Sequence, residues 1–237
     1  MPVSRLLRIT QLFGLPDGTV RTALTRMARA GDLSNEGDGR YQLSSRLLAR
    51  QARQSESRAA AVVPWNGRWR MAVVVGSARS AAERTSLRTA MSQLRLAELR
   101  EGAWCRPDNL DPRRLPDARA VVDIQCRWWS ANPDIDEGEM TSSLWDIDGW
   151  QLTAGRLRRS LGRLRPRLEA GKTDALRPGF VLSAAVLRHF QADPLLPPEL
   201  LPRRWDGAAL RRDYDRFDVA YRSLLVDWVS RVGEPSG

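Results

Sequence analysis

The feature that most constrains this chain is a 30-residue segment in which a glycine turn, an amphipathic helix and a hairpin follow one another. The segment reads "GLPDGTVRTALTRMARAGDLSNEGDGRYQL", residues 14–43. At 100° per residue, Val20, Leu24 and Met27 share one face of the helix. Gly31 ends the helix, and "GDG" then separates two short strands, which is typical of a β-hairpin. A helix and a hairpin so close together predict a small DNA-binding module.

A second helix is expected before the turn. The stretch "SRLLRITQLFGL" places Leu6, Leu7, Ile9 and Phe13 so that a preceding helix gains an apolar side. The order helix, glycine turn, helix and hairpin predicts a winged helix-turn-helix, in which the second helix reads DNA.

The outward face of that second helix is polar in a way that suits base recognition. Arginine can bond guanine with two hydrogen bonds, and threonine can contact a thymine methyl group or a phosphate. An ordinary solvated face is the alternative, because arginine is abundant in the whole chain. We favour DNA binding because turn, polarised helix and hairpin coincide. The predicted contact residues on this helix are Arg21, Thr22, Thr25, Arg26 and Arg29.

The charge of the chain supports a polyanionic partner. The formal net charge is +10, and residues 1–58 hold ten arginines against five acidic residues, so half of the net charge lies in the first quarter of the sequence. A strongly basic surface attracts nucleic acid and phosphorylated ligands. The N-terminus lacks the apolar core of a secretory signal, so we expect a cytoplasmic protein with no membrane partner.

The middle of the chain predicts a ferredoxin-like α+β domain. Met71–Val75 is a short apolar run expected to be a strand, and residues 77–99 are expected to be a helix. "GAWCRP" and "RAVVDIQCRWW" are expected to be two further strands, and strand, helix, strand, strand is how a ferredoxin-like unit begins. The only cysteines, Cys105 and Cys126, are expected to be buried thiols.

The last third is expected to be helical. Leucines recur every three or four residues from Leu157 to Leu168, where Pro166 should kink or end the helix. A second helix from about Ala208 to Val232 carries an apolar stripe, which forms either intrachain core, the option we favour, or a dimer contact; its members are Phe217, Tyr221, Leu224, Leu225 and Trp228.

These patterns give an α+β protein in four parts. We expect a winged helix-turn-helix at 1–45, a connecting helix or linker at 46–64, a ferredoxin-like domain at 65–149 and a helical domain at 150–237.

Three motifs give the chain a family resemblance. "LFGLPDGTVRTALTRMARAGDL", "WNGRWRMAVV" and "HFQADPLLPPELLPRRWDG", in this order, resemble the PaaX family of bacterial transcriptional repressors, which control phenylacetate degradation. The resemblance implies a homodimeric repressor of an aromatic catabolic operon, which binds a double-stranded operator and is released by an aryl-CoA such as phenylacetyl-CoA. It places the wing at Leu33–Leu43, with Arg40 and Tyr41 on its return strand as further DNA-binding residues.

Two departures from the family pattern accompany the resemblance. Family members usually have a helix before the one that begins near Ser4, so the winged-helix domain of this sequence is expected to lack its first helix. Pro16 stands where the family tends to place a small polar helix cap, although Asp17 can still favour the helix N-terminus through its charge.

Tryptophans near the middle domain suggest a place for the effector. Most of them should be core. An aromatic wall would suit an aryl group, however, and nearby arginines would suit CoA phosphates. The candidate effector-binding residues, chosen by adjacency in the sequence, are Trp65, Arg68, Trp69, Arg70 and Arg127.

We expect no enzyme, no catalytic residue, no metal site and no cofactor. "AGKTDA" lacks the upstream glycine of a phosphate-binding loop, and His189 is the only histidine. A metal-dependent nuclease built on the middle domain is the alternative function. The first expected strand of that domain carries no carboxylate, whereas Asp123 is expected on a later strand. The acidic residues of "NPDIDEGE" are expected to form a solvated loop.

Overall fold

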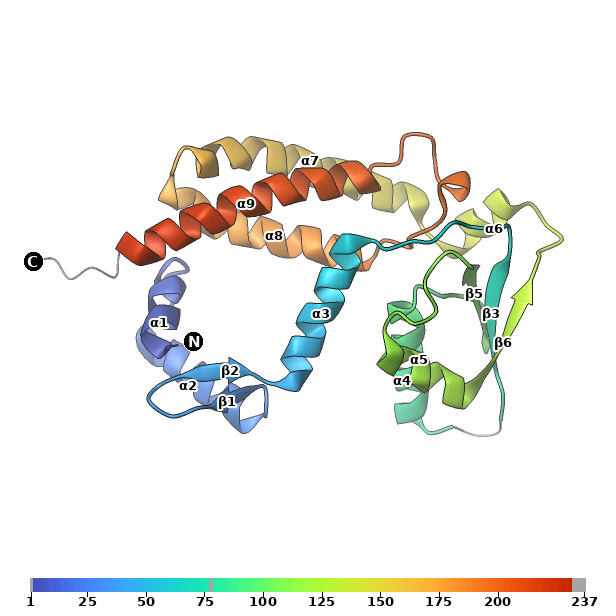
Figure 1. Cartoon of the computed structure of the whole chain (residues 1–237), viewed down its shortest axis with the longest axis horizontal. Helices are drawn as coiled ribbons and strands as arrows, with labels where there is room; N and C mark the ends of the chain where they lie inside the picture. Colours follow the sequence, from blue (N-terminus) through green and yellow to red (C-terminus); the bar gives the residue numbers. More distant parts are fainter. Residues whose placement is uncertain (1, 77–78, 232–237) are drawn as a thin grey trace, which may run out of the picture. The chain divides into compact units, whose positions relative to one another are not determined.

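The computed structural model describes residues 2–76 and 79–231, and these fall into two compact units (Figure 1). Unit 1 comprises residues up to Ser55 together with Ala154–His189 and the segment from Gly207 onward. Unit 2 comprises Glu56–Thr153 and Phe190–Asp206. Both units are therefore assembled from separate stretches of chain, which differs from the four consecutive parts expected from the sequence.

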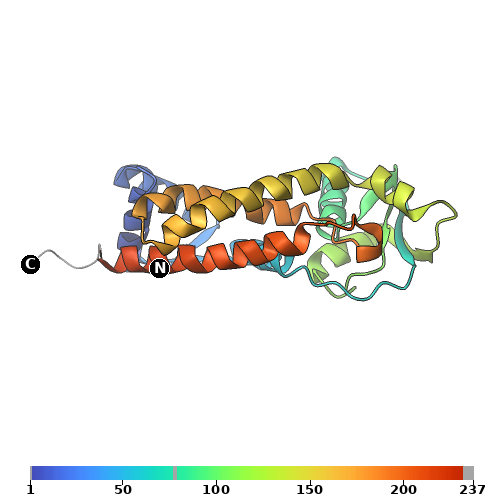
Figure 2. The ribbon, with the colours of Figure 1, turned by 90° about the horizontal axis from the view of Figure 1, so that it is seen from above.

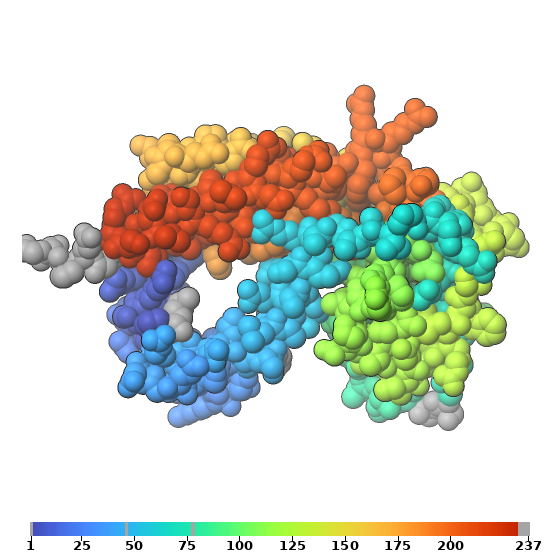
Figure 3. All heavy atoms as spheres, in the orientation of Figure 1, coloured from blue at the N-terminus to red at the C-terminus, as the bar shows by residue number. Residues whose placement is uncertain are grey.

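The first part of unit 1 is a helix-turn-helix followed by a hairpin. Its elements are α1 (Val3–Gln11), α2 (Asp17–Arg29), β1 (Leu33–Asn35) and β2 (Tyr41–Leu43). The two strands pair antiparallel, and Pro2 forms an isolated bridge with Arg40 that adds the start of the chain to the hairpin. In the space-filling view the hairpin lies at the surface of its unit (Figure 3), although Leu33 of β1 is buried.

A small apolar core holds these elements together. Leu7 of α1 packs with Val20 and Leu24 of α2 and with Leu33 of β1. The helix that follows, α3 (Ser45–Ala59), contributes Leu47 to the edge of this core and ends in residues that belong to unit 2. The connection after the wing is therefore a helix over most of its length.

Most of three long helices makes up the rest of unit 1. They are α7 (Ile147–Glu169), α8 (Leu176–Gln191) and α9 (Gly207–Arg231), with a short 3-10 turn η1 (Thr173–Ala175) between the first two. The helices lie side by side along most of their lengths (Figure 2). Pro166 neither breaks nor ends α7, which continues for three further residues to Glu169.

The apolar stripe of α9 is intrachain core. Phe217 is fully buried, Tyr221 and Leu224 are buried, and Leu225 and Trp228 are half-buried. Gly179 of α8 lets Tyr221 approach closely, because a Cβ at this position would lie 2.9 Å from the Tyr221 ring. The stripe is thus used within the protomer, as we favoured.

Unit 2 contains the expected ferredoxin-like arrangement. Its elements are β3 (Trp69–Val74), α4 (Ala81–Gln93), β4 (Ala97–Arg100), β5 (Ala103–Pro107), α5 (Pro116–Gln125) and β6 (Cys126–Ala131). The strand order is β4-β5-β3-β6 and all neighbouring strands are antiparallel. The helices α4 and α5 pack against one face of the sheet around Ala72, Met91 and Val122.

Two element boundaries differ from the sequence prediction. The helix expected at 77–99 ends at Gln93, and residues 97–100 form the strand β4. The prediction of a strand in "RAVVDIQ" was wrong, because this stretch lies in α5. The strand of this region is Cys126–Ala131. Pro116 starts the helix, and Ala118 and Val122, four residues apart, bury its inner side.

The opposite face of the sheet carries a second core. Trp69 and Cys105 pack there with Met140 of α6 (Glu137–Leu144). Of the acidic stretch expected to be a solvated loop, residues 132–136 form a largely exposed loop and residues 137–139 form the start of α6, where the Asp136 side chain accepts a hydrogen bond of 2.9 Å from the Glu139 amide. An aspartate at this position stabilises the first turn of a helix, which explains the cluster of acids.

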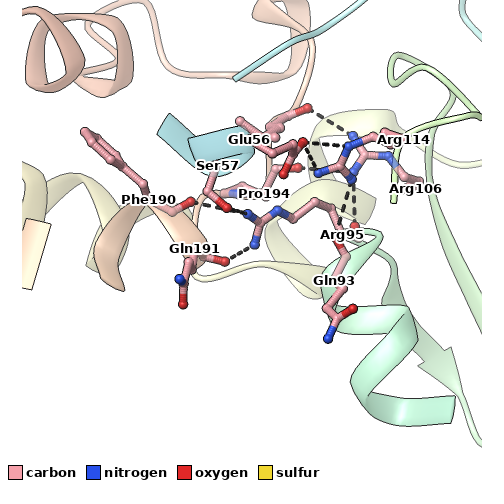
Figure 4. Close-up of polar contacts among 10 residues, drawn as sticks. Glu56, Ser57, Gln93, Arg95, Arg106, Arg114, Phe190, Gln191 and Pro194 are labelled. Carbon is pink, nitrogen blue, oxygen red and sulfur yellow. Dashed lines mark hydrogen bonds and ion pairs between the residues drawn. The ribbon is translucent and has the colours of Figure 1, made fainter. Parts of the chain in front are cut away.

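The proline-rich segment 190–206 belongs to unit 2 and includes the 3-10 turn η2 (Pro198–Leu200). Residues 193–197 are buried, although the segment has few regular hydrogen bonds of its own. Its carbonyl groups instead accept hydrogen bonds from arginines of the middle domain: Arg106 donates to Pro194 and Leu195, and Arg95 donates to Gln191 (Figure 4).

Arg95, Arg106 and Arg114 form a buried arginine group that also binds the end of α3. Arg114 pairs with Glu56, and Arg95 donates a 3.0 Å hydrogen bond to the hydroxyl of Ser57 (Figure 4). Burial lowers the pKa of Arg106 to about 9, with the neighbouring charges of Arg114 and Arg95 acting in the same direction. Three guanidinium groups thus connect segments that are distant in sequence within unit 2.

None of the helices in the described ranges is long and apolar enough to cross a membrane.

Candidate nucleic-acid interface

The helix α2 presents the face that the sequence predicted. Val20 and Leu24 are buried at 7% and 8% exposure. The five predicted contact residues on the other side are all exposed: Arg21, Thr22, Thr25, Arg26 and Arg29. The structure therefore brings one polar, basic surface together on a single helix.

The turn before α2 fixes where the helix begins. Gly14 has a φ of +66°, a left-handed conformation that glycine adopts without strain. The Leu15 amide then donates to the Thr10 carbonyl at 3.3 Å, and Pro16 occupies the N-cap position in an extended conformation. No side chain caps α2, so Asp17 in the first turn is the feature that favours this helix end.

The threonine hydroxyls of α2 bond to their own helix. Thr22 donates to the Gly18 carbonyl at 2.9 Å, and Thr25 donates to the Arg21 carbonyl at 3.1 Å. With the hydroxyl proton used in this way, each exposed threonine offers a methyl group and an acceptor oxygen to a partner. The methyl groups suit thymine, whereas the adjacent arginines supply the donors for guanine.

The wing adds one further basic side chain. Gly37, Asp38 and Gly39 all have positive φ, and the Asn35 side chain accepts a 3.0 Å hydrogen bond from the Gly37 amide. Arg40 follows this tip and is exposed. Tyr41, predicted with it, lies half-buried against the core of the winged helix, so its ring packs beneath the wing.

The predicted effector residues do not line one pocket. Trp69 is 2% exposed and lies on the α6 face of the sheet, together with Trp65, whose indole donates to the Arg68 carbonyl at 2.7 Å. Arg70 lies on the opposite face, where it pairs with Asp108 at 2.9 Å. Arg68 and Arg127 are both exposed.

The other residues considered for catalysis, phosphate binding or metal binding occupy ordinary structural positions. Asp123 lies on α5 rather than on a strand, and its carboxylate accepts from Arg119 at 2.8 Å and from the Trp128 indole. Lys172 and Thr173 follow a long helix, and His189 is half-buried on α8. Within residues 2–76 and 79–231, no group of three or more histidine, cysteine or acidic side chains is placed to hold a metal ion.

Comparisons with known proteins agree with this geometry. Residues 1–47 match the family described as PaaX-like protein, and residues 62–121 match the PaaX protein central Cas2-like domain. A solved structure, described as uncharacterized protein Rv0674 from Mycobacterium tuberculosis, is 39% identical over 96% of this chain and 91% of that chain, with a TM-score of 0.68. The chain belongs to the PaaX family. No curated protein matches it.

The PaaX family is a family of transcription regulators. The first matched region ends with the residues that follow the wing, and the second spans β3 to α5. The two matches thus coincide with the winged helix of unit 1 and with most of the ferredoxin-like part of unit 2.

Proposed function

We propose that this PaaX-family protein is a repressor that reads its operator with α2 and holds the DNA backbone with Arg40 of the wing. The observation that supports this is the exposed face of α2, where arginines and threonines lie opposite the buried Val20 and Leu24. Base contacts would come from Thr22, Thr25 and Arg26. Phosphate contacts would come from Arg40, because a hairpin beside the groove meets the backbone first.

The proposed target is an aromatic, phenylacetate-type catabolic operon, and the proposed effector is phenylacetyl-CoA or a related aryl-CoA. The family relationship supports both parts of this proposal. The measurement is operator release: the thioester, but not free CoA, should dissociate the protein from DNA. Binding that is unchanged by any aryl-CoA would contradict the effector.

We also propose a homodimer in which each protomer reads one half-site. The apolar stripe of α9 is buried within the protomer, so a dimer would use another surface. Light scattering should show two copies at micromolar concentration. A monomer both with and without operator DNA would contradict this part of the proposal.

The central test separates base contacts from phosphate contacts. Arg26→Ala should cost about 1–3 kcal/mol of binding free energy and relax sequence preference at one operator position. Arg40→Ala should weaken binding to all sequences about equally and reduce the salt slope by roughly one unit. Operator selection followed by titrations at several salt concentrations measures both effects.

The matched control is Arg113→Ala, which removes an exposed arginine outside the winged helix. Its binding should equal that of the unmodified protein. If Arg26→Ala leaves both affinity and preference unchanged, α2 is not the reading helix.

A nuclease activity of the middle domain is disfavoured by two observations. The strand β3, Trp69–Val74, contains no carboxylate, and Asp123 is occupied by Arg119 and Trp128. We expect no cleavage of DNA or RNA with magnesium or manganese. Metal-dependent cleavage that disappears in Asp123→Ala would overturn this expectation.

A further inference from the structure

An apolar groove lies in unit 1, between α7 and α8. Its volume is about 670 Å³. Volumes of roughly 300–1,000 Å³ are usual for sites that bind small organic molecules. Its floor is apolar and consists of Leu164 from α7 and Pro178, Val181, Leu182 and Ala185 from α8.

Packing within the chain leaves part of this apolar floor exposed. The inward sides of the two helices are occupied by Leu161 and Leu168 of α7 and by Val186 of α8, which are buried. Leu164 and Leu182 continue these buried faces and are half-buried, whereas Pro178 is exposed and Val181 is 62% exposed. An apolar surface of this kind, open to solvent and bordered by charge, is typical of a binding site.

The border of the groove is basic. Arg163, Arg167 and Arg177 line it, and no acidic residue lines it in the described part of the chain. Arg167 pairs with Asp174 at 2.8 Å, but both side chains are more than half exposed, so the pair is weak and can exchange for another anion. Arg163 donates a hydrogen bond of 3.4 Å to the Ser160 hydroxyl.

The same charges argue against a second copy of this chain in the groove. A two-fold contact sets the same surface against itself. Three arginines would then face three arginines, in a protein whose net charge is already +10. A complementary occupant carries negative charge beside an apolar body.

We propose that the α7–α8 groove binds an amphipathic organic anion, with its apolar body on the leucine and valine floor and its acidic group at the arginine border. The proposal goes beyond the operon and effector proposed above, because it follows from the chemistry of the groove alone. Its test therefore uses dyes and no thioester, and either proposal can fail without the other.

The experiment compares two dyes with the same aromatic body. 8-Anilinonaphthalene-1-sulfonate carries a sulfonate, whereas N-phenyl-1-naphthylamine lacks it. Fluorescence titration should show saturable binding of the sulfonate dye with at least tenfold higher affinity than the neutral dye. Replacing both Arg163→Gln and Arg177→Gln should remove most of this difference and leave the affinity for the neutral dye within about twofold.

Two floor variants and one control complete the design. Ala185→Trp should place a bulky ring on the groove floor and lower the affinity for both dyes at least tenfold. Val181→Glu alters a position that is exposed to solvent, and it should weaken binding of the sulfonate dye selectively. Arg159→Gln removes an exposed arginine of α7 that does not line the groove, and it should change neither affinity.

The proposal would be overturned if the unmodified protein and the border variant bound the sulfonate dye with equal affinity. A dimer that Ala185→Trp converts to a monomer while dye binding persists would overturn it as well, since the groove would then be an interface between copies. Circular dichroism melting of each variant shows whether unit 1 is intact. If Ala185→Trp does not fold, Val181→Glu and the border pair still decide the outcome.

Discussion

Arg95 occupies a backbone conformation that usually selects glycine. Its φ is +63°, and it follows the last turn of α4, where the Leu96 amide donates to the Met91 carbonyl at 3.0 Å. Glycine is the common residue at such a helix end, because other residues adopt the left-handed region at a cost of about 1–3 kcal/mol. The arginine is retained here by its buried hydrogen bonds to Ser57 and to the carbonyls of Phe190 and Gln191.

Two substitutions at Arg95 separate the backbone strain from the hydrogen bonds. Arg95→Ala should lower the free energy of unfolding of unit 2 by about 2–4 kcal/mol, because buried carbonyls lose their donor. Arg95→Gly should lower it by roughly 1 kcal/mol less, since glycine relieves the strained φ. Urea unfolding followed by tryptophan fluorescence measures both. Two variants of equal stability would contradict the strain, and a glycine variant as stable as the unmodified protein would contradict the role of the hydrogen bonds.

Cys105 should make stability depend on alkaline pH. Burial raises the pKa of its thiol to about 11. Between about pH 9 and pH 11 the folded protein therefore keeps a proton that the unfolded chain releases, so the stabilising contribution is present below pH 9 and is lost as the pH rises through 11. Unfolding free energies measured across this range should fall less steeply in Cys105→Ala. Identical slopes would contradict the assignment.

At the scale of elements, the contact between α8 and α9 depends on one missing side chain. A methyl group at Gly179 would meet the Tyr221 ring at 2.9 Å, and Tyr221 is buried. Gly179→Ala should destabilise unit 1 by about 1–2 kcal/mol, because overpacking outweighs the gain in helix propensity.

Gly162 of α7 supplies the matched control for this prediction. A Cβ there meets nothing within 4 Å, so Gly162→Ala should stabilise the protein by about 0.5–1 kcal/mol. Thermal unfolding of the two variants should therefore shift in opposite directions. A stabilised Gly179→Ala variant would show that Tyr221 moves aside freely.

The elements whose pattern is local were predictable from the sequence. In α2 the apolar positions repeat with the helical period and the glycine turn precedes them, so both the helix and its exposed face were confirmed. The helical structure of "RAVVDIQ" was not predicted, because its valines favour a strand by composition. The packing of Val122 against α4 stabilises a helix instead. Tertiary contacts override propensity in such a short stretch.

The candidate sites also divide into one that follows from a local sequence pattern and others that depend on tertiary structure. The predicted reading face needed only the geometry of one helix. The predicted effector residues were chosen because they are adjacent in sequence. Successive residues of a strand point to opposite faces of the sheet, so Trp69 and Arg70 necessarily lie on opposite faces. The α7–α8 groove depends on how two helices lie together, and the spacing of residues within either helix does not reveal it.

At the scale of the whole molecule, unit 1 is complete only when α9 packs with its earlier segments. A protein that stops after Asp206 would lack α9 and with it Phe217, Tyr221 and Leu224, while unit 2 would keep both of its segments. Hydrogen exchange should then show loss of protection in α7 and α8, with β3 and β5 still protected. Unchanged protection in α7 and α8 would contradict the assignment of α9 to their core.

The split origin of unit 1 also sets an order of events on the ribosome. The helix α2 ends at Arg29 and α9 begins only at Gly207, about 180 residues later, which takes roughly 9–36 s to translate at about 5–20 residues per second. Once α7 and α8 have been translated, their inward faces have no α9 to cover them until the 25 residues of that helix follow. The nascent chain therefore carries the helix-turn-helix for seconds before the α9 segment of unit 1 exists, and the proposed operator binding would mature only once α9 has been translated.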